Sequence, residues 1–103
     1  MISLTKEPGP IAIALDDEAG VTCGELLVRP CQGRVRVALV VLGEQSDEWL
    51  LEPGQAANAP ALLEAAADHG APVWYDLALE PAQARELARA IRHTAALVRR
   101  GWA

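Results

Sequence analysis

The fold is decided near the end of the chain, by residues 73–102, which read VWYDLALEPAQARELARAIRHTAALVRRGW. Alternating apolar residues from Val73 to Leu79 predict a β-strand, and Glu80-Pro81 marks the change to a helix, because proline suits a helix's first turn. At about 100° per residue, this helix separates two kinds of side chain. One side is predicted to pack on a sheet and carries Leu87, Ile91, Thr94, Val98 and Trp102. The other side is an arginine stripe, formed by Arg85, Arg89, Arg92, Arg99 and Arg100.

Turn signals divide the first half of the chain into short apolar runs that predict an antiparallel meander. Residues 16–20, 30–33 and 43–46 contain the acidic, proline and glycine residues that are typical of such turns. The predicted strands cover residues 11–15, 21–29, 34–42 and 47–52. The third stops alternating after Val37, which predicts a central strand that is buried on both faces at its end.

A shorter helix is predicted between the fourth and fifth strands. Asn58 fits its N-cap, Pro60 its first turn, and Asp68 its end. The strands on either side of it would allow a right-handed parallel crossover. The order β-β-β-β-α-β-α predicts an α+β fold, a two-layer sandwich of a mainly antiparallel five-stranded sheet with two helices on one face. Residues 1–103 are expected to form a single domain, with the other sheet face partly bare.

A six-residue motif occurs twice, 28 residues apart. Residues 51–56, LEPGQA, recur as residues 79–84, LEPAQA, each time between an apolar run and an alanine-rich segment. Two interpretations are open: duplication of a strand-helix unit, or independent use of an acid and a proline that suit the positive end of a helix. Because Pro60 would correspond to the mid-helix Ala88, we expect the two helices not to start alike.

Composition excludes several classes of protein. The 103 residues are 51% hydrophobic and 22% charged, which are ordinary globular proportions. The longest apolar run, Val37 to Leu42, is too short to cross a bilayer, and Met1 to Gly9 lack the pattern of a secretory signal. We therefore expect no membrane association and a cytoplasmic location. Twenty alanines, and eight arginines against one lysine, indicate a GC-rich bacterial or phage genome.

Charge is distributed unevenly within a net charge of −5. Residues 1–80 carry 13 acidic and four basic groups, a balance of −9, whereas residues 81–103 carry one acidic and five basic groups, a balance of +4. The arginine stripe favours an acidic protein partner, because guanidinium groups bind carboxylates bidentately. The acidic body of a second copy would qualify. A nucleic-acid partner is not favoured, because the same body would repel phosphates.

Side chains that carry catalysis are scarce. Cys23 is predicted to be buried within a strand and Cys31 to lie exposed in a turn, about 26 Å away, which is too far for a disulfide. His69 and His93 are the only histidines, and neither has a recognisable catalytic partner. No nucleophile elbow, calcium loop or phosphate-binding glycine loop is present in the sequence. We expect no catalytic residue, no metal site and no cofactor.

The sequence favours a non-enzymatic protein-interaction module, a regulator or inhibitor that binds another protein and forms a homodimer. The expected partner-binding residues are Arg85, Arg89, Arg92, Arg99, Trp74 and Trp102. Trp74 alternates out of phase with Tyr75, so it lies either exposed, where aromatic residues favour an interface, or under a helix.

Two alternative functions stay open at this point. In the first, the acidic body mimics nucleic acid and blocks a host defence enzyme, as an inhibitor from a phage or mobile element would. In the second, a pocket between the sheet and the helices belongs to a small-ligand enzyme that uses His93 or Asp76.

Overall fold

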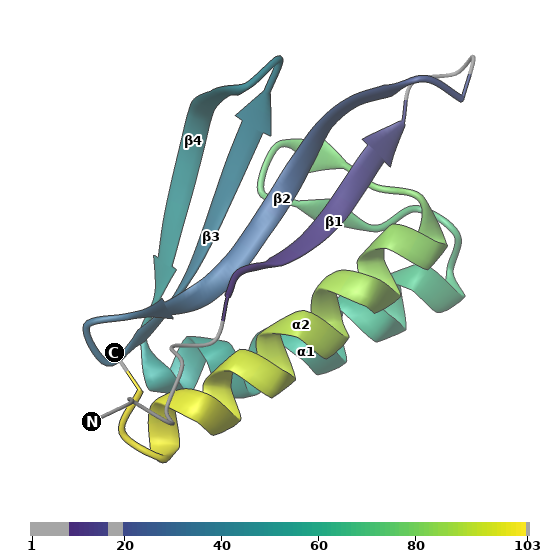
Figure 1. Ribbon diagram of the computed structural model, residues 1–103. Helices are drawn as coiled ribbons and strands as arrows, with labels where there is room; N and C mark the ends of the chain where they lie inside the picture. The colour runs from purple at the N-terminus through teal and green to yellow at the C-terminus, as the bar shows by residue number, and fades with distance from the viewer. Residues whose placement is uncertain (1–8, 17–19, 103) are drawn as a thin grey trace.

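A computed structural model of the chain describes residues 9–16 and 20–102 and shows a β-sheet layer on a layer of two helices (Figure 1). The sheet is an antiparallel meander of four strands in the spatial order β1 (Ile11–Asp16), β2 (Thr22–Cys31), β3 (Arg34–Val41) and β4 (Glu44–Leu51). These four strands were predicted, although β4 begins before the predicted residue 47. The predicted turn at 16–20 includes residues 17–19, which lie outside the described part. β1 and β4 form the two edges of the sheet.

Two tight hairpin turns join β2 to β3 and β3 to β4. They are formed by Gln32-Gly33 and Leu42-Gly43, and all four residues have positive φ values, between 51° and 82°. This is the type I′ pattern, whose twist matches that of the flanking strands. Leu42 occupies such a position without being glycine or asparagine, and 88% of its surface is exposed. Turn geometry therefore determines the hairpin register, although the positive φ is an unfavourable backbone conformation for Leu42.

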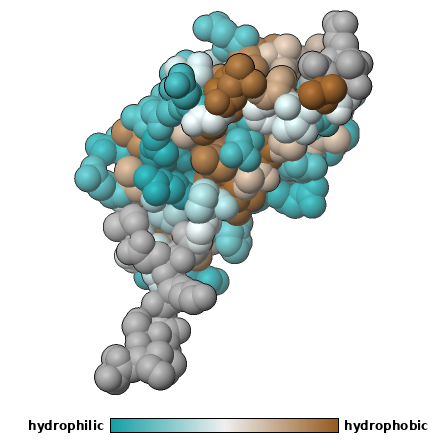
Figure 2. All heavy atoms as spheres, turned by 45° about the horizontal axis from the view of Figure 1, so that its top comes forward, coloured by the Kyte–Doolittle hydropathy of each residue, from teal (hydrophilic) through white to brown (hydrophobic). Residues whose placement is uncertain are grey.

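Strand alternation sorts the side chains of the sheet onto two faces. The face toward the helices forms the core with Ile13, Leu26, Val28, Val35, Val37 and Leu51, each at most 2% exposed. Within the described residues no helix covers the opposite face, which carries Leu27, Ala38, Val40 and Leu50 between charged side chains. Figure 2, turned toward this side, shows hydrophobic side chains gathered among hydrophilic ones.

The two helices, α1 (Pro53–Asp68) and α2 (Pro81–Arg99), start in the same way. In each, the N-cap glutamate donates its backbone N–H to a glutamine oxygen three residues later at 2.9 Å: Glu52 to Gln55, and Glu80 to Gln83. This reciprocal capping box accounts for the repeated LEP-x-QA motif as boundary chemistry. The expectation that the helices start differently, with Asn58 as N-cap, was wrong. Pro60 lies buried inside α1, where its fixed φ is already helical.

Both helices lie side by side against the same face of the sheet, as predicted (Figure 1). α2 buries the expected apolar side, with Leu87, Ile91 and Thr94 at most 1% exposed and Val98 half-buried. Four alanines of α2 are also buried: Ala84, Ala88, Ala90 and Ala95. Their small side chains allow α2 to approach both the sheet and α1 closely.

The prediction of a fifth strand across residues 73–79 was wrong in its extent. β5 (Val73–Trp74) and β6 (Leu77–Ala78) form a separate two-stranded hairpin, and Tyr75, with a φ of 54°, reverses the chain between them together with Asp76. Trp74 pairs with Leu77 and therefore shares a face with it, so the alternation changes phase at the turn. The two strands are only two residues long, so the sequence pattern alone did not reveal this change. In the described residues the main sheet therefore has four strands, and the parallel crossover is not formed.

Candidate functional site

The arginine stripe is divided by contacts with the neighbouring helix. Arg85 pairs with Asp68 at 3.1 Å, and Arg92 donates to both carboxylate oxygens of Glu64 at 2.5 and 2.6 Å. Both acids lie on α1, so these two arginines link the helices. The hydrogen bond from Arg92 lowers the pKa of the Glu64 carboxyl and, reciprocally, raises the pKa of Arg92. Two of the five stripe arginines are therefore exposed but already paired within the chain.

The other arginines of the stripe point elsewhere. Arg89, Arg99 and Arg100 are exposed and form no side-chain hydrogen bond or ion pair with any residue in the ranges 9–16 and 20–102. Arg89 is among the residues that line a substantial cavity between α2 and β1. Arg99 lines a much smaller cavity, of about 20 Å³, beside Leu51 of the other edge strand, β4.

Trp74 and Trp102, the two predicted tryptophan anchors, are less exposed than the anchors of an open binding surface would be. Trp74 is only 5% exposed, because α1 packs against β5, so the expectation of an exposed anchor was wrong and the covered alternative is correct. Its ring N–H has no hydrogen-bond partner within the described residues. Trp102 follows α2, is half-buried, and donates its backbone N–H to the Leu97 carbonyl at 3.1 Å.

Three aromatic rings form a cluster at the β5–β6 hairpin. Trp49 stacks on Tyr75 with centroids 5.3 Å apart and an interplanar angle of 14°, while Trp74 meets both rings edge-on at 5.9 and 5.2 Å. A cavity of about 240 Å³ beside them is lined by Leu39, Asp47, Trp49, Tyr75, Asp76 and Leu77. Asp76 thus lies near a second acid and two aromatic rings, and no histidine lines this cavity.

The two cysteines are free and lie at opposite ends of β2. Cys23 is exposed, contrary to the prediction, because this end of the sheet projects beyond the helices (Figure 1). Its thiol donates to the Leu15 carbonyl at 3.3 Å. Cys31 is half-buried, as the last residue of the strand rather than a turn residue.

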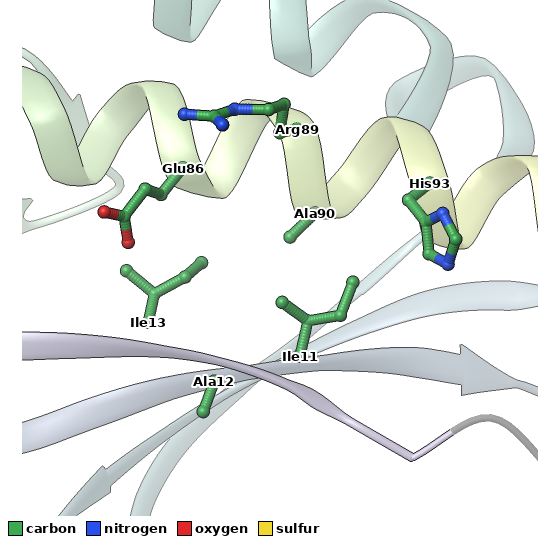
Figure 3. Close-up of a pocket in the computed structure, with 7 residues that line it drawn as sticks. All are labelled: Ile11, Ala12, Ile13, Glu86, Arg89, Ala90 and His93. Carbon is green, nitrogen blue, oxygen red and sulfur yellow. The ribbon is translucent and has the colours of Figure 1, made fainter.

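A slot of about 430 Å³, which we name the β1–α2 slot, lies between the edge strand β1 and helix α2 (Figure 3). It is lined by Ile11, Ala12, Ile13, Glu86, Arg89, Ala90 and His93. Figure 3 shows Ile11 and Ile13 pointing toward α2 and Ala90 pointing toward β1. The Glu86 carboxylate lies at the Ile13 end, and His93 lies at the Ile11 end. The slot therefore has apolar walls and a charged or polar group at each end.

The outer edge of β1 opens onto this slot. Gln83 on α2 donates its Nε2 hydrogen to the Ala14 carbonyl at 3.2 Å, which shows that this carbonyl points away from β2. Strand backbone groups alternate in direction with a period of two, so the N–H and C=O of Ala12 point outward as well. The Ala12 side chain points away from α2 in Figure 3, and its main chain therefore lines the mouth of the slot. No described strand pairs with this edge.

The slot is poorly arranged for catalysis. Glu86 and His93 lie seven residues apart on one helix, which separates them by about 10 Å along its axis. His93 forms no hydrogen bond or ion pair with any residue that the structure describes, so nothing orients its ring as a general base would require. Apolar walls beside an unpaired strand edge suit binding of a polypeptide instead.

No protein-family model matches this chain, and no curated protein or solved structure is significantly similar to it. Neither described helix is both long enough and apolar enough to cross a membrane. Among residues 9–16 and 20–102, no three His, Cys, Asp or Glu side chains gather where they could hold a metal ion. The case for function therefore depends on the geometry of the chain itself.

The sequence identified only part of the β1–α2 slot. Arg89 and His93 were singled out, but Ile11, Ala12, Glu86 and Ala90 were not. One usable signal was present, because the first strand of a meander lies at an edge unless a later strand returns to it. Which residues of α2 face that edge depends on how the helix rotates against the sheet, and the sequence pattern alone does not specify that rotation.

Proposed function

We propose that this chain is a non-enzymatic protein-interaction module that binds a polypeptide strand along β1, over the β1–α2 slot. The observation that carries the proposal is an edge with which no strand of residues 9–16 and 20–102 pairs, and whose outward backbone groups at Ala12 open onto a cavity with apolar walls. In this mode of recognition, main-chain hydrogen bonds supply affinity, and pockets for alternate side chains supply specificity. A regulator or inhibitor that acts by occupying another protein's segment would use such a site.

The two edges of the sheet are unequal, which supports β1 as the binding edge. β4 is rich in acidic side chains, with Glu44, Asp47 and Glu48, and its pairing with β3 shifts register between Leu39 and Val40. Charged side chains and bulges are features by which proteins keep an edge from pairing. β1 instead alternates isoleucine, alanine and leucine, and its first charge, Asp16, and its own register shift, between Leu15 and Asp16, come only at its end. The protected edge is β4, and the unprotected edge is β1.

The slot defines the chemistry of a bound strand. Residues of that strand that point toward α2 would lie between Ile11, Ile13 and Ala90, so they should be apolar. Beyond this apolar stretch, a basic side chain would suit the Glu86 end, and a side chain that accepts a hydrogen bond would suit the His93 end. Residues that point the other way would join the uncovered sheet face beside Ala12, where small side chains fit.

The other two functions receive less support from the geometry. For the enzyme, His93 lacks an orienting partner, as described above, and Asp76 lies apart from it in a different cavity. For the nucleic-acid mimic, four acids of the body are already neutralised by arginines of the same chain, in the pairs Arg34–Glu52, Arg36–Glu48, Arg85–Asp68 and Arg92–Glu64. A mimic of phosphates needs its negative charges free.

The proposal is tested with the variant Ala12→Pro, which removes the outward N–H without removing a bond to β2. Eight-residue peptides are selected for binding to the wild type from a random displayed library. We expect their affinity for Ala12→Pro to fall about tenfold or more, since a central strand bond contributes about 0.5–1.5 kcal/mol and proline also distorts the pairing. The control Ala12→Val keeps the N–H and should bind normally. Peptides that bind Ala12→Pro as well as the wild type would refute the proposal.

A further inference from the structure

We infer that the strand bound at β1 is the β1 strand of a second copy, so that two chains join into one continuous sheet across a twofold axis. This inference rests on the proposed function, because it requires that the β1 edge accepts a strand. The resulting sheet would have eight strands, four from each copy, with both helix pairs on the same face. Edge-to-edge pairing of this kind is isologous, since the same surface serves both partners.

The outward backbone groups select one register for this pairing. If the axis passes at Ala12, the two Ala12 residues exchange both hydrogen bonds, and Ala14 lies opposite the partner's Pro10. Proline has no N–H to offer to the Ala14 carbonyl. That carbonyl already accepts from Gln83, so it needs no bond from the partner. The Ala14 N–H can still donate to the carbonyl of the partner's Pro10, and every outward donor of this stretch is then satisfied.

The apolar walls of the slot also fit this register. Across the axis, Ile11 would lie opposite the partner's Ile13, with both side chains on the face toward the helices. Ile11 is only half-buried in the single chain, whereas Ile13 is 1% exposed. Pairing would cover the remaining surface of Ile11 in both copies. β-Branched residues directly opposite each other on neighbouring strands pack favourably.

Polar groups along α2 are complementary to those of a second copy in the same register, because the Glu86 carboxylate can accept a hydrogen bond from the His93 ring. α2 runs antiparallel to β1, with Glu86 beside Ile13 and His93 beside Ile11, on opposite sides of the level of Ala12 (Figure 3). A twofold axis at that level places Glu86 opposite the partner's His93, twice in the dimer. An axis at Ile13 would instead bring the two Glu86 carboxylates together, which is unfavourable. Side-chain charge and backbone bonding therefore favour the same register.

The other charged group of the slot, Arg89, lies near the proposed axis. In Figure 3 its side chain turns from the level of Ala90 toward the Glu86 end, away from β1. In the dimer it would therefore lie at the rim, beside Glu86 of its own helix, rather than between the two strands. Arginine at the rim of an interface tolerates its symmetry mate because water and Glu86 screen both charges.

The first experiment measures the mass of the purified chain in solution by light scattering after size-exclusion chromatography. We expect the wild type and Ala12→Val to have twice the mass of one chain, and Ala12→Pro to have the mass of one chain. A monomeric wild type would overturn the inference, and so would a dimer that persists in Ala12→Pro, because it would use another surface. If the wild type is monomeric while selected peptides still depend on Ala12, only the inference fails and the proposed function stands.

A second experiment stays informative even if Ala12→Pro does not fold. Glu86→Lys removes the acceptor opposite His93 twice in the dimer, and His93→Glu places two carboxylates opposite each other twice. Each variant alone should therefore dimerise about tenfold or more weakly. Mixed together, they should form a heterodimer, because Lys then faces Glu at one contact and the native pair is restored at the other. The inference would be overturned if the single variants dimerised with the same affinity as the wild type. It would also be overturned if mixing the two variants did not increase the fraction of dimer.

Discussion

The two capping glutamines provide a matched comparison inside one molecule. Gln55 and Gln83 each accept the backbone N–H of an N-cap glutamate at 2.9 Å, but only Gln83 also donates to a strand, through its bond to the Ala14 carbonyl at 3.2 Å. Replacing Gln55 with alanine therefore removes one hydrogen bond at the start of α1. Replacing Gln83 with alanine removes the equivalent bond of α2 and also the link between α2 and β1.

The expected losses follow from that difference. A net hydrogen bond contributes about 0.5–1.5 kcal/mol, so Gln55→Ala should lower the free energy of unfolding by about that amount. Gln83→Ala should cost about 1–3 kcal/mol, because two bonds are lost. The excess of about 1 kcal/mol corresponds to a difference of roughly 4–8 °C in Tm for a domain of this size. Guanidinium denaturation at constant pH measures the free energy of unfolding, and a thermal melt measures Tm.

A second pair of variants separates the cap from the link. Gln83→Glu keeps an oxygen that can accept the Glu80 N–H but replaces the donor to Ala14 with an acceptor, whereas Gln55→Glu should leave α1 unaffected. We expect Gln83→Glu to lose the link alone. Equal losses for Gln55→Ala and Gln83→Ala, together with an unchanged Gln83→Glu, would show that the bond to Ala14 does not hold α2 against β1.

Two further predictions concern exposed positions. Leu42→Asn should raise the free energy of unfolding by about 0.5–1 kcal/mol, because asparagine accepts positive φ more readily than leucine; denaturation measures it, and a loss of stability would contradict the strained-turn interpretation. The Glu64 carboxyl should titrate below its ordinary pKa of 4.5 in carbon NMR, and Arg92→Gln should move its midpoint up. The stabilisation from this pair is complete above pH 4.5 and is lost as the pH falls through the lowered pKa. An identical midpoint in both proteins would contradict the ion pair.

The local structure of α2 could be predicted because its signals lie within the segment itself. The spacing of Leu87, Ile91 and Thr94 predicts the buried side, and Glu80-Pro81 predicts the start. For α1 the same start signal was present at Glu52-Pro53, but Pro60 was taken as the first-turn proline in its place. A buried proline inside a helix is tolerated when packing outweighs one lost hydrogen bond, and sequence spacing does not reveal that packing.

The candidate site was less accessible from the sequence, for reasons that the arginines show. Arg85, Arg89 and Arg92 fall on one side of a helical projection, yet Arg85 and Arg92 bind α1 whereas Arg89 lines the β1–α2 slot. A projection shows angular position on one helix and contains no information about what lies on either flank. Likewise, period-two alternation in residues 73–79 did not show that Tyr75 reverses the chain and brings its ring onto Trp49.

The sequence by itself determined the α+β class, the four-strand meander, and the buried side and the start of α2. Each depends on neighbours within a few residues, where periodicity, capping and turn preferences act. Only the tertiary structure decided that no described strand pairs with the outer edge of β1 over the slot, that two arginines are bound by α1, and that Trp74 is covered. Those properties arise from contacts between segments distant in the chain, whose relative rotation and spacing are determined by packing of the whole core.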